Sequence, residues 1–334
     1  MERIMVTGGA GFIGSNLVDA VLTSGQEVDV VDDLSTGHLS NLAMARVIGQ
    51  GRLSFHQMDV RSPALVDLAK RRKPSVIFHL AARTNVNHSL EDPFDDLTVN
   101  LGGTLRVLEA ALAGGTSKVV FTTSAAVYGD HPAGELPLSE STPMAPLSPY
   151  GASKRAALDY LDVYRRSRDL EYTALVFANV YGPRQRGAAE SGVISIFVER
   201  ALSGRPVTIY GDGSQTRDFV FVADVVDALI RAGDNGGGLT INIGSGAQTS
   251  VKDLYGLVAK VTGSTLRPRN AAARPGDIMF SALDASRALT QLGWKPVVTL
   301  DEGLRELVSW YGEHPDLLVL KRGKHAVDDA VAVE

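Results

Sequence analysis

The chain contains no cysteine among its 334 residues, which excludes disulfide bonds, thiolate metal sites and cysteine nucleophiles. No apolar run approaches the ~20 residues of a membrane helix, and the first ten residues lack the basic flank and apolar stretch of a signal peptide. The seven histidines include no pair spaced four apart, so we expect no metal site. A net charge of −5 is unlike the basic face that binds nucleic acid. We therefore expect a cytoplasmic protein whose partners include neither membrane nor nucleic acid.

The first half of the chain alternates apolar strands with helical patterns. Hydrophobic residues make up 44% of the chain and charged residues 21%, as in globular proteins with a large core. Six apolar segments (3–6, 27–31, 53–58, 76–80, 118–123 and 172–177) are separated by patterns that predict helices at 12–23, 63–72, 96–113 and 149–168. Such strands suit a parallel sheet covered on both faces. The fold class expected is α/β, with a doubly wound parallel sheet of the dinucleotide-binding (Rossmann) type.

The pattern changes after residue 180. Short apolar segments at 207–210 and 219–221 alternate with predicted helices near 193–203, 223–232, 251–262 and 301–311. We expect a smaller C-terminal α/β lobe that binds the substrate, with the chain returning to the main sheet. Residues 1–178 and about 217–245 would form the dinucleotide-binding domain. Residues 179–216 and 246–320 would form the lobe, and 321–334 a mobile tail.

A glycine-rich segment lies between the first strand and the first helix. Gly8, Gly11 and Gly14 follow the spacing G-x-x-G-x-x-G, which permits a tight turn, close approach of a pyrophosphate and close packing of helix on strand. Asp32 ends the second strand, where a carboxylate can accept hydrogen bonds from both ribose hydroxyls and repel a 2′-phosphate. The neighbouring Asp33 is an alternative acceptor. The segment therefore predicts NAD rather than NADP, with Asp59 and Val60 after the third strand as weaker candidates for the adenine.

A second motif, Tyr150-Gly-Ala-Ser-Lys154, opens a predicted helix. Residues four apart share one helix face, so both side chains can reach one site. A free phenol has a pKa near 10, and a base that works near neutrality needs a pKa about 3 units lower, or about 4 kcal/mol of stabilisation. Lys154 and the positively charged nicotinamide ring are the obvious sources of this stabilisation. Ser124 ends a strand upstream, where its hydroxyl can orient a substrate hydroxyl.

Together these motifs resemble those of the extended short-chain dehydrogenases/reductases, and most closely the UDP-glucose 4-epimerase family. The segments that carry the resemblance are 7–14, 79–82, 124–129, 150–154, 177–184, 211–218 and 274–277. They follow the family's order over nearly the whole chain.

The resemblance implies a role for each of several residues. Tyr150 would be the base, Lys154 would lower its pKa and hold the nicotinamide ribose, and Ser124 would bind the reacting hydroxyl. The NAD contacts implied are Gly8, Gly11, Phe12, Ile13, Gly14, Asp32, Asp59, Val60, Ala81, Ala82, Asn100, Tyr150 and Lys154. The substrate contacts implied are Arg83, Ser124, Ala125, Tyr150, Asn179, Arg184, Val193, Thr208, Tyr210, Arg217, Arg274 and Asp277, with Arg217 and Arg274 on the diphosphate.

Relatives that dehydrate or decarboxylate carry an acid in the loop after the serine or threonine. Here that loop reads Ala125-Ala126, and neither side chain can move a proton. The resemblance therefore implies epimerisation at C4 of a UDP-hexose through a transient 4-keto sugar, with NAD tightly bound. UDP-glucose and UDP-galactose are the first expectation.

Other functions remain open at this stage. Arg83, Arg184 or Arg186 facing a C6 carboxylate would favour UDP-glucuronate, and the small Ser281 leaves room for an N-acetyl group. A non-catalytic NAD-binding protein should have lost Tyr150 or Lys154, and a ketoreductase that uses NADPH is disfavoured by Asp32. The resemblance also implies a homodimer formed through the helices near 96–113 and 149–168.

Overall fold

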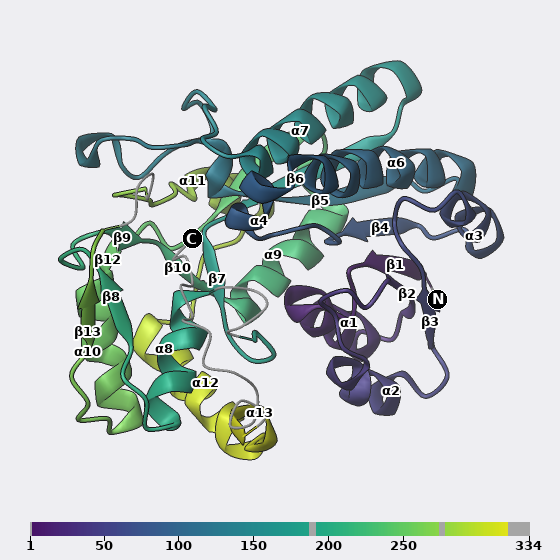
Figure 1. Ribbon diagram of the computed structural model, residues 1–334. Coiled ribbons are helices and arrows are strands. Elements are labelled where there is room, and N and C mark those ends of the chain that lie inside the picture. The colour runs from purple at the N-terminus through teal and green to yellow at the C-terminus, as the bar shows by residue number, and fades with distance from the viewer. Residues whose placement is uncertain (1, 187–191, 274–277, 320–334) are drawn as a thin grey trace.

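The computed structural model describes residues 2–186, 192–273 and 278–319. Its centre is a seven-stranded sheet of order β11-β6-β5-β4-β1-β2-β3, in which every neighbouring pair is parallel (Figure 1). The strands are β1 (Arg3–Thr7), β2 (Glu27–Asp32), β3 (Leu53–Gln57), β4 (Val76–His79), β5 (Lys118–Ser124), β6 (Glu171–Phe177) and β11 (Leu239–Ile243). The predicted doubly wound parallel sheet is confirmed.

Both faces of this sheet are buried, because successive apolar residues along each strand point to opposite sides. Val6 and Val30 face one hydrophobic cluster, while Met5 and Val31 face the other. The first face is covered by α1 (Phe12–Thr23) and α9 (Val222–Asp234), with α2 (Ala43–Gly49) beside α1. The second is covered by α3 (Ala64–Arg72), α6 (Gly103–Gly114) and α7 (Pro149–Arg168).

The predicted helix over 96–113 is interrupted. The chain forms α4 (Val86–Glu91) and α5 (Pro93–Leu97), then a π-helical turn η2 (Thr98–Gly102) that leads into α6. Asn100 lies in this turn, and its carbonyl oxygen accepts a hydrogen bond from the Thr104 hydroxyl at 2.5 Å. π-Turns of this kind occur mostly at functional sites. Here the turn lies beside the loop that follows β4.

The second part of the chain lies at the carboxyl end of the sheet (Figure 1). It contains three two-stranded sheets: β7 (Asn179–Tyr181) with β10 (Phe219–Phe221), β9 (Thr216–Arg217) with β12 (Thr249–Ser250), and β8 (Thr208–Tyr210) with β13 (Arg269–Ala271). Its helices are α8 (Val193–Leu202), α10 (Val251–Thr262), α11 (Ser286–Leu292), α12 (Leu300–Glu313) and α13 (Asp316–Val319). Short 3₁₀ turns are η1 (Leu39–Leu42), η3 (Ala125–Val127) and η4 (Ala133–Glu135). The division into two domains at the boundaries given above stays a prediction.

No helix within the described ranges has the length and apolar character needed to cross a bilayer.

Candidate active site

A cavity of about 670 Å³ runs along the carboxyl ends of β1 to β6. This edge is where open α/β sheets bind ligands. Predicted site residues that line it are Gly8, Gly11, Phe12, Ile13, Gly14, Asp32, Asp59, Val60, Ala81, Ala82, Arg83, Ser124, Ala125, Tyr150, Lys154, Asn179 and Arg217. The structure therefore brings the glycine loop and the Tyr150–Lys154 motif to one site.

Other predicted residues do not line the cavity. These are Asn100, Arg184, Val193, Thr208 and Tyr210. Arg274 and Asp277 lie outside the described residues. Direct ligand contacts by these residues stay predictions.

The glycine loop lies so close to neighbouring backbone that two of its positions have no room for a side chain. Gly8 has φ +72°, and a Cβ there would lie 2.6 Å from the backbone nitrogen of Ala81. A Cβ on Gly14 would lie 2.1 Å from the carbonyl oxygen of Gly8. Gly11 precedes α1 and caps it with no side chain, so the first backbone N–H groups of the helix face the cavity as donors for an anion. The loop fits a pyrophosphate.

Asp32 ends β2 with its side chain buried against the glycine loop. Its carboxylate accepts hydrogen bonds from the backbone nitrogens of Ala10 and Leu34, both at 2.9 Å. Burial raises the pKa of Asp32, and the two backbone hydrogen bonds oppose that rise. A carboxylate has about four acceptor positions, so two remain for ribose hydroxyls. The exposed Asp33 instead accepts a hydrogen bond from the backbone nitrogen of Ser35.

The adenine-side candidate Asp59 is a half-buried partner of Arg61. The two side chains make a forked hydrogen bond with distances from 2.6 to 3.0 Å. Hydrogen bonding by Arg61 lowers the pKa of Asp59. Both carboxylate oxygens of Asp59 are engaged with Arg61, and Asp59 lines the cavity next to Val60.

The predicted catalytic motif, Tyr150 to Lys154, lies at the first turn of α7. Ser148 caps this helix by accepting a hydrogen bond from the Gly151 nitrogen at 3.1 Å. Lys154 is buried, and its ammonium donates to the carbonyl oxygen of Thr122 at 3.0 Å and lies 4.8 Å from the centre of the Phe121 ring. Burial lowers the pKa of Lys154 to about 8. A buried cation thus lies one helical turn from Tyr150, and its predicted role of lowering the pKa of the phenol stays a prediction.

Hydroxyl groups at the end of β5 complete this side of the cavity. Ser124 lines the cavity, and its oxygen accepts a hydrogen bond from the Ala126 nitrogen at 3.3 Å. Thr123 also lines it, and its buried hydroxyl has no hydrogen-bond partner among the described residues. Buried polar groups are normally hydrogen-bonded. A polar ligand in the cavity would supply the missing hydrogen-bond partner of this hydroxyl.

Asn100 supports the site from behind rather than lining it. Its amide donates to the Arg83 carbonyl oxygen at 3.0 Å and to Asp96 at 2.8 Å, and its oxygen accepts from the Arg83 nitrogen at 2.8 Å. The buried Asp96 also accepts a hydrogen bond from Ser153 of α7 at 2.6 Å. Asn100 and Asp96 thus fix the loop after β4 against the helix that carries Tyr150.

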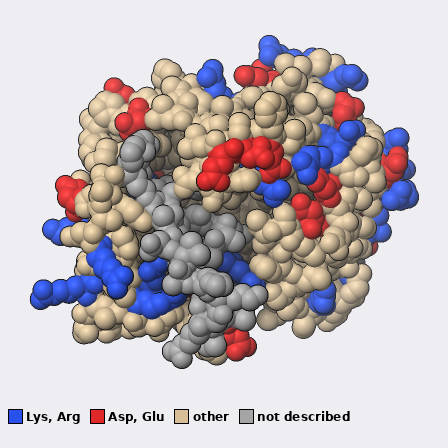
Figure 2. Space-filling model, viewed as in Figure 1, with Lys and Arg blue, Asp and Glu red and all other residues tan. Residues whose placement is uncertain are grey.

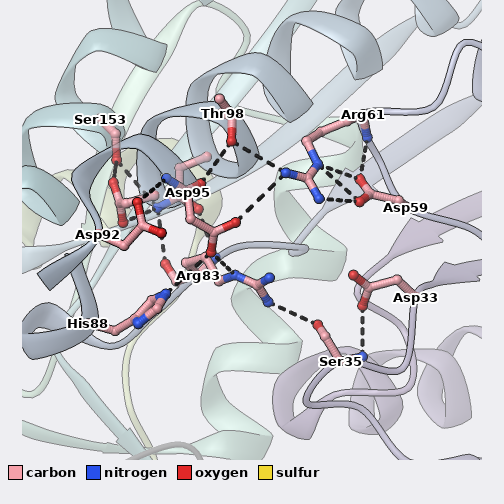
Figure 3. Close-up of polar contacts among 12 residues, drawn as sticks. Asp33, Ser35, Asp59, Arg61, Arg83, His88, Asp92, Asp95, Thr98 and Ser153 are labelled. Atoms are coloured by element: carbon pink, nitrogen blue, oxygen red, sulfur yellow. Dashed lines mark hydrogen bonds and ion pairs between the residues drawn. The ribbon is translucent and has the colours of Figure 1, made fainter.

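The arginines considered for a sugar carboxylate are engaged elsewhere. Arg184 pairs at 2.5 Å with Asp19 of α1. Arg186 donates to the Ser40 hydroxyl at 3.3 Å. Arg83 donates to Asp95 at 2.7 Å and to Ser35 at 3.1 Å (Figure 3). Ser35 closely follows Asp32, so Arg83 lies at the ribose-binding end of the cavity predicted for NAD.

Several lining residues did not come from sequence reasoning. They include Ser35, Thr36, Leu80, Val86, Asn87, Phe177, Gln185 and Gly192. Four of them, Ser35, Thr36, Leu80 and Phe177, lie at or just after strand ends, so the rule that ligands bind there could have found them. Val86 and Asn87 lie in the short polar helix α4, which has no apolar period to mark it. Ser281, weighed for the sugar pocket, does line the cavity.

Among the described residues, no group of three or more histidine, cysteine, aspartate or glutamate side chains could hold a metal ion.

Comparison with known proteins agrees with this geometry. Residues 4–244 match the model of the NAD dependent epimerase/dehydratase family. A UDP-glucose 4-epimerase of Mycolicibacterium smegmatis is 46% identical over 311 residues, covering 92% of this chain and 98% of that protein.

Two solved structures are similar over nearly their full length. A UDP-glucose 4-epimerase of Thermotoga maritima with UDP-glucose has a TM-score of 0.90 and 38% identity, covering 94% of this chain and 99% of that one. A UDP-glucose 4-epimerase of Thermus thermophilus in complex with NAD has a TM-score of 0.86 and 38% identity, covering 93% and 99%. The predicted NAD cofactor is thereby confirmed. The chain belongs to the NAD dependent epimerase/dehydratase family.

Proposed function

We propose that this protein interconverts UDP-glucose and UDP-galactose by oxidation and reduction at C4 of the hexose. The observation that carries the proposal is the presence of Ser124, Tyr150 and Lys154 on one cavity wall, which continues from the glycine loop. The similarity to UDP-glucose 4-epimerases over almost the whole chain supports the same reaction.

The chemistry of the side chains follows from their positions. Tyr150 is the base that takes the proton from the C4 hydroxyl, and Lys154 stabilises the phenolate. Ser124 holds the C4 oxygen and shares its proton. Gly8 to Gly14 and Asp32 would hold NAD, which would supply the hydride chemistry needed at C4 of the sugar.

The proton-transfer groups available near Ser124 favour epimerisation over elimination. Dehydration needs a separate acid on the departing hydroxyl, but Ala125 and Ala126 form the adjoining η3 turn. The carboxylates among the described lining residues are Asp32, Asp33 and Asp59. All three lie at the ends of β2 or β3, at least three strands away from β5. They lie too far along the sheet edge to act at C4.

The sugar is assigned from the charges around the cavity. A uronate needs a cation to offset the desolvation of its carboxylate. Arg184 and Arg186 do not line the cavity, and Arg83 is engaged at the ribose-binding end. These positions support a neutral hexose over UDP-glucuronate. The N-acetyl alternative depends on space beside Ser281, and similarity to UDP-glucose 4-epimerases favours the unsubstituted sugar.

The direct test incubates the NAD-loaded protein with UDP-glucose, UDP-glucuronate and UDP-N-acetylglucosamine in turn, with ¹H NMR of the C4 epimers. We expect the highest kcat/KM for UDP-glucose. We also expect Arg184→Met to leave the ratio of UDP-glucuronate to UDP-glucose turnover unchanged. Efficient turnover of UDP-glucuronate with negligible turnover of UDP-glucose would overturn the assignment of the sugar.

The proposal includes a homodimer. Apolar side chains are exposed along α4, α5 and α7: Leu90 by 60%, Phe94 by 77%, Leu97 by 44%, Tyr160 by 42% and Val163 by 47%. Exposed apolar patches of this kind mark protein interfaces, and the family resemblance points to a second copy of the chain as the occupant. Sedimentation of the wild type as a dimer, and of Phe94→Asp as a monomer, would support this assembly. A wild-type monomer would contradict it. Localisation in the cytoplasm stays a prediction.

A further inference from the structure

One side chain bridges the two loops that flank the glycine loop. Arg83 follows β4, and its Nη1 donates a hydrogen bond to the hydroxyl of Ser35, which follows β2, at 3.1 Å (Figure 3). Both residues line the cavity. The contact therefore joins one wall of the cofactor groove to the other.

The order of the strands shows what lies beneath this bridge. β1 lies between β4 and β2 in the sheet. A contact from the end of β4 to the end of β2 must therefore cross the end of β1, where Gly8 begins the glycine loop. This is the place where the fold binds the pyrophosphate and the adenosine ribose of a dinucleotide. The Arg83–Ser35 contact spans that place.

The two ends of the bridge are held very differently. On the β4 side, the Arg83 Nε donates to Asp95 at 2.7 Å, and the exposed fractions of the two side chains are 26% and 23%. Asn100 fixes the backbone of Arg83 as described above. On the β2 side, the contact is one hydrogen bond to an exposed neutral hydroxyl. Both are charge-assisted hydrogen bonds, but only the Asp95 contact joins two opposite charges. The Ser35 contact is thus the weaker end of the bridge.

Asp95 is itself held in place by its neighbours. Its backbone nitrogen donates to Asp92, which caps α5, at 3.0 Å. Its carboxylate also accepts from His88 at 3.3 Å and lies 3.8 Å from Arg61. Hydrogen bonding by Arg83 lowers the pKa of Asp95. Figure 2 shows acidic side chains gathered where α4 lies, with basic side chains beside them.

We propose that Arg83, held by Asp95, is a positioning residue that closes the cofactor groove over the glycine loop and sets the rate at which NAD leaves. The inference rests on the proposed function, because an epimerase must keep the same dinucleotide between two half-reactions. Opening requires only the Ser35 contact to break, while Asp95 keeps Arg83 ready to close again.

The test measures dissociation of NAD rather than turnover. Protein loaded with radiolabelled NAD is freed of unbound nucleotide and diluted into excess unlabelled NAD, and the label that stays bound is followed with time. We expect Arg83→Met to speed dissociation roughly tenfold or more, and Ser35→Ala by a smaller factor. The double variant should release NAD no faster than Arg83→Met alone, because both changes remove one contact. Asp95→Asn should fall between the two single variants.

A matched control separates this role from a general loss of stability. Arg165→Met also removes an arginine that pairs with a carboxylate, Glu171, but Arg165 does not line the cavity. It should release NAD at the wild-type rate. An unchanged rate in Arg83→Met, or multiplied effects in the double variant, would overturn the inference. Slow NAD release without formation of UDP-galactose would overturn the proposed function alone.

Discussion

Gly151 lies against the carbonyl oxygen of Ala126 so closely that a Cβ on Gly151 would be 2.6 Å from it. Ala126 belongs to the η3 turn that follows Ser124, and Gly151 follows Tyr150 in the first turn of α7. The missing side chain therefore lets the helix that carries Tyr150 approach the turn that Ser124 caps. The relative position of Tyr150 and Ser124 depends on this contact between backbones.

We predict that Gly151→Ala lowers kcat strongly while the protein remains folded and NAD-bound. The added methyl group pushes α7 from η3, and a displacement of about 1 Å can cost roughly a hundredfold in rate. Gly256→Ala in α10 is the matched control, because a Cβ there meets nothing within 4 Å. Steady-state kinetics with UDP-glucose would check both variants, and equal rates in the two would contradict the expected role of the contact.

Tyr150→Phe should lower turnover by about 10²–10⁴, the usual contribution of a general base. The ring still packs in place, so bound NAD should be retained. Tyr164→Phe on the same helix removes a hydroxyl that donates to Glu109 away from the cavity, and it should turn over at the wild-type rate. A Tyr150→Phe variant within threefold of wild type would exclude Tyr150 as the base.

The sequence predicted those elements whose pattern is local. The helix at 12–23 has the same bounds in the structure, because glycines precede and follow an uninterrupted apolar period. The short helix α4 was missed because its sequence is mostly polar and it is held by the Asn85 cap. The π-turn around Asn100 interrupts the apolar period at 96–113 through a hydrogen bond that composition does not reveal.

The residues of the candidate site could be predicted where the signal is local. The glycine spacing and the Tyr150–Lys154 spacing are local signals, and the residues of both line the cavity. The partners of charged side chains are not local. Asp19 is 165 residues from Arg184 along the chain, and only the fold shows that the two side chains pair. The same holds for Ser35, which lies 48 residues from Arg83.

Asp32 should determine the preference for NAD. Two unit charges about 4 Å apart interact by about 4 kcal/mol at an effective dielectric constant of 20, so a 2′-phosphate beside this carboxylate should bind at least tenfold more weakly. Asp32→Ala should therefore lower the ratio of the NADP and NAD dissociation constants, measured by competition binding. The change should be partial because Asp33 remains at the cavity wall. Equal affinity of the wild type for both nucleotides would refute this assignment.

His79 should make the free energy of unfolding decrease at acidic pH. It is buried between the hydroxyls of Thr7 and Thr104, at 2.7 and 3.0 Å, and burial lowers its pKa to about 3. In the unfolded chain His79 takes up a proton as pH falls below 6.5, whereas in the fold it stays neutral until about pH 3. The free energy of unfolding is therefore unaffected by His79 above pH 6.5 and decreases as pH falls from 6.5 toward 3. Between pH 7.5 and pH 5 this group alone should remove about 2 kcal/mol from the free energy of unfolding.

Urea unfolding of wild type and His79→Gln at the two pH values isolates this contribution. The variant lacks the titrating ring, so its loss of stability between pH 7.5 and pH 5 should be smaller by about 2 kcal/mol. An identical loss in both proteins would show that His79 is not held neutral in the fold.

The hydride path is tested most directly with UDP-glucose that carries deuterium at C4. Removal and return of one hydride at C4 predicts UDP-galactose that retains the deuterium at C4, observed by NMR after the reaction reaches equilibrium in ordinary water. Formation of UDP-galactose with hydrogen from solvent at C4, or no UDP-galactose at all, would contradict the account.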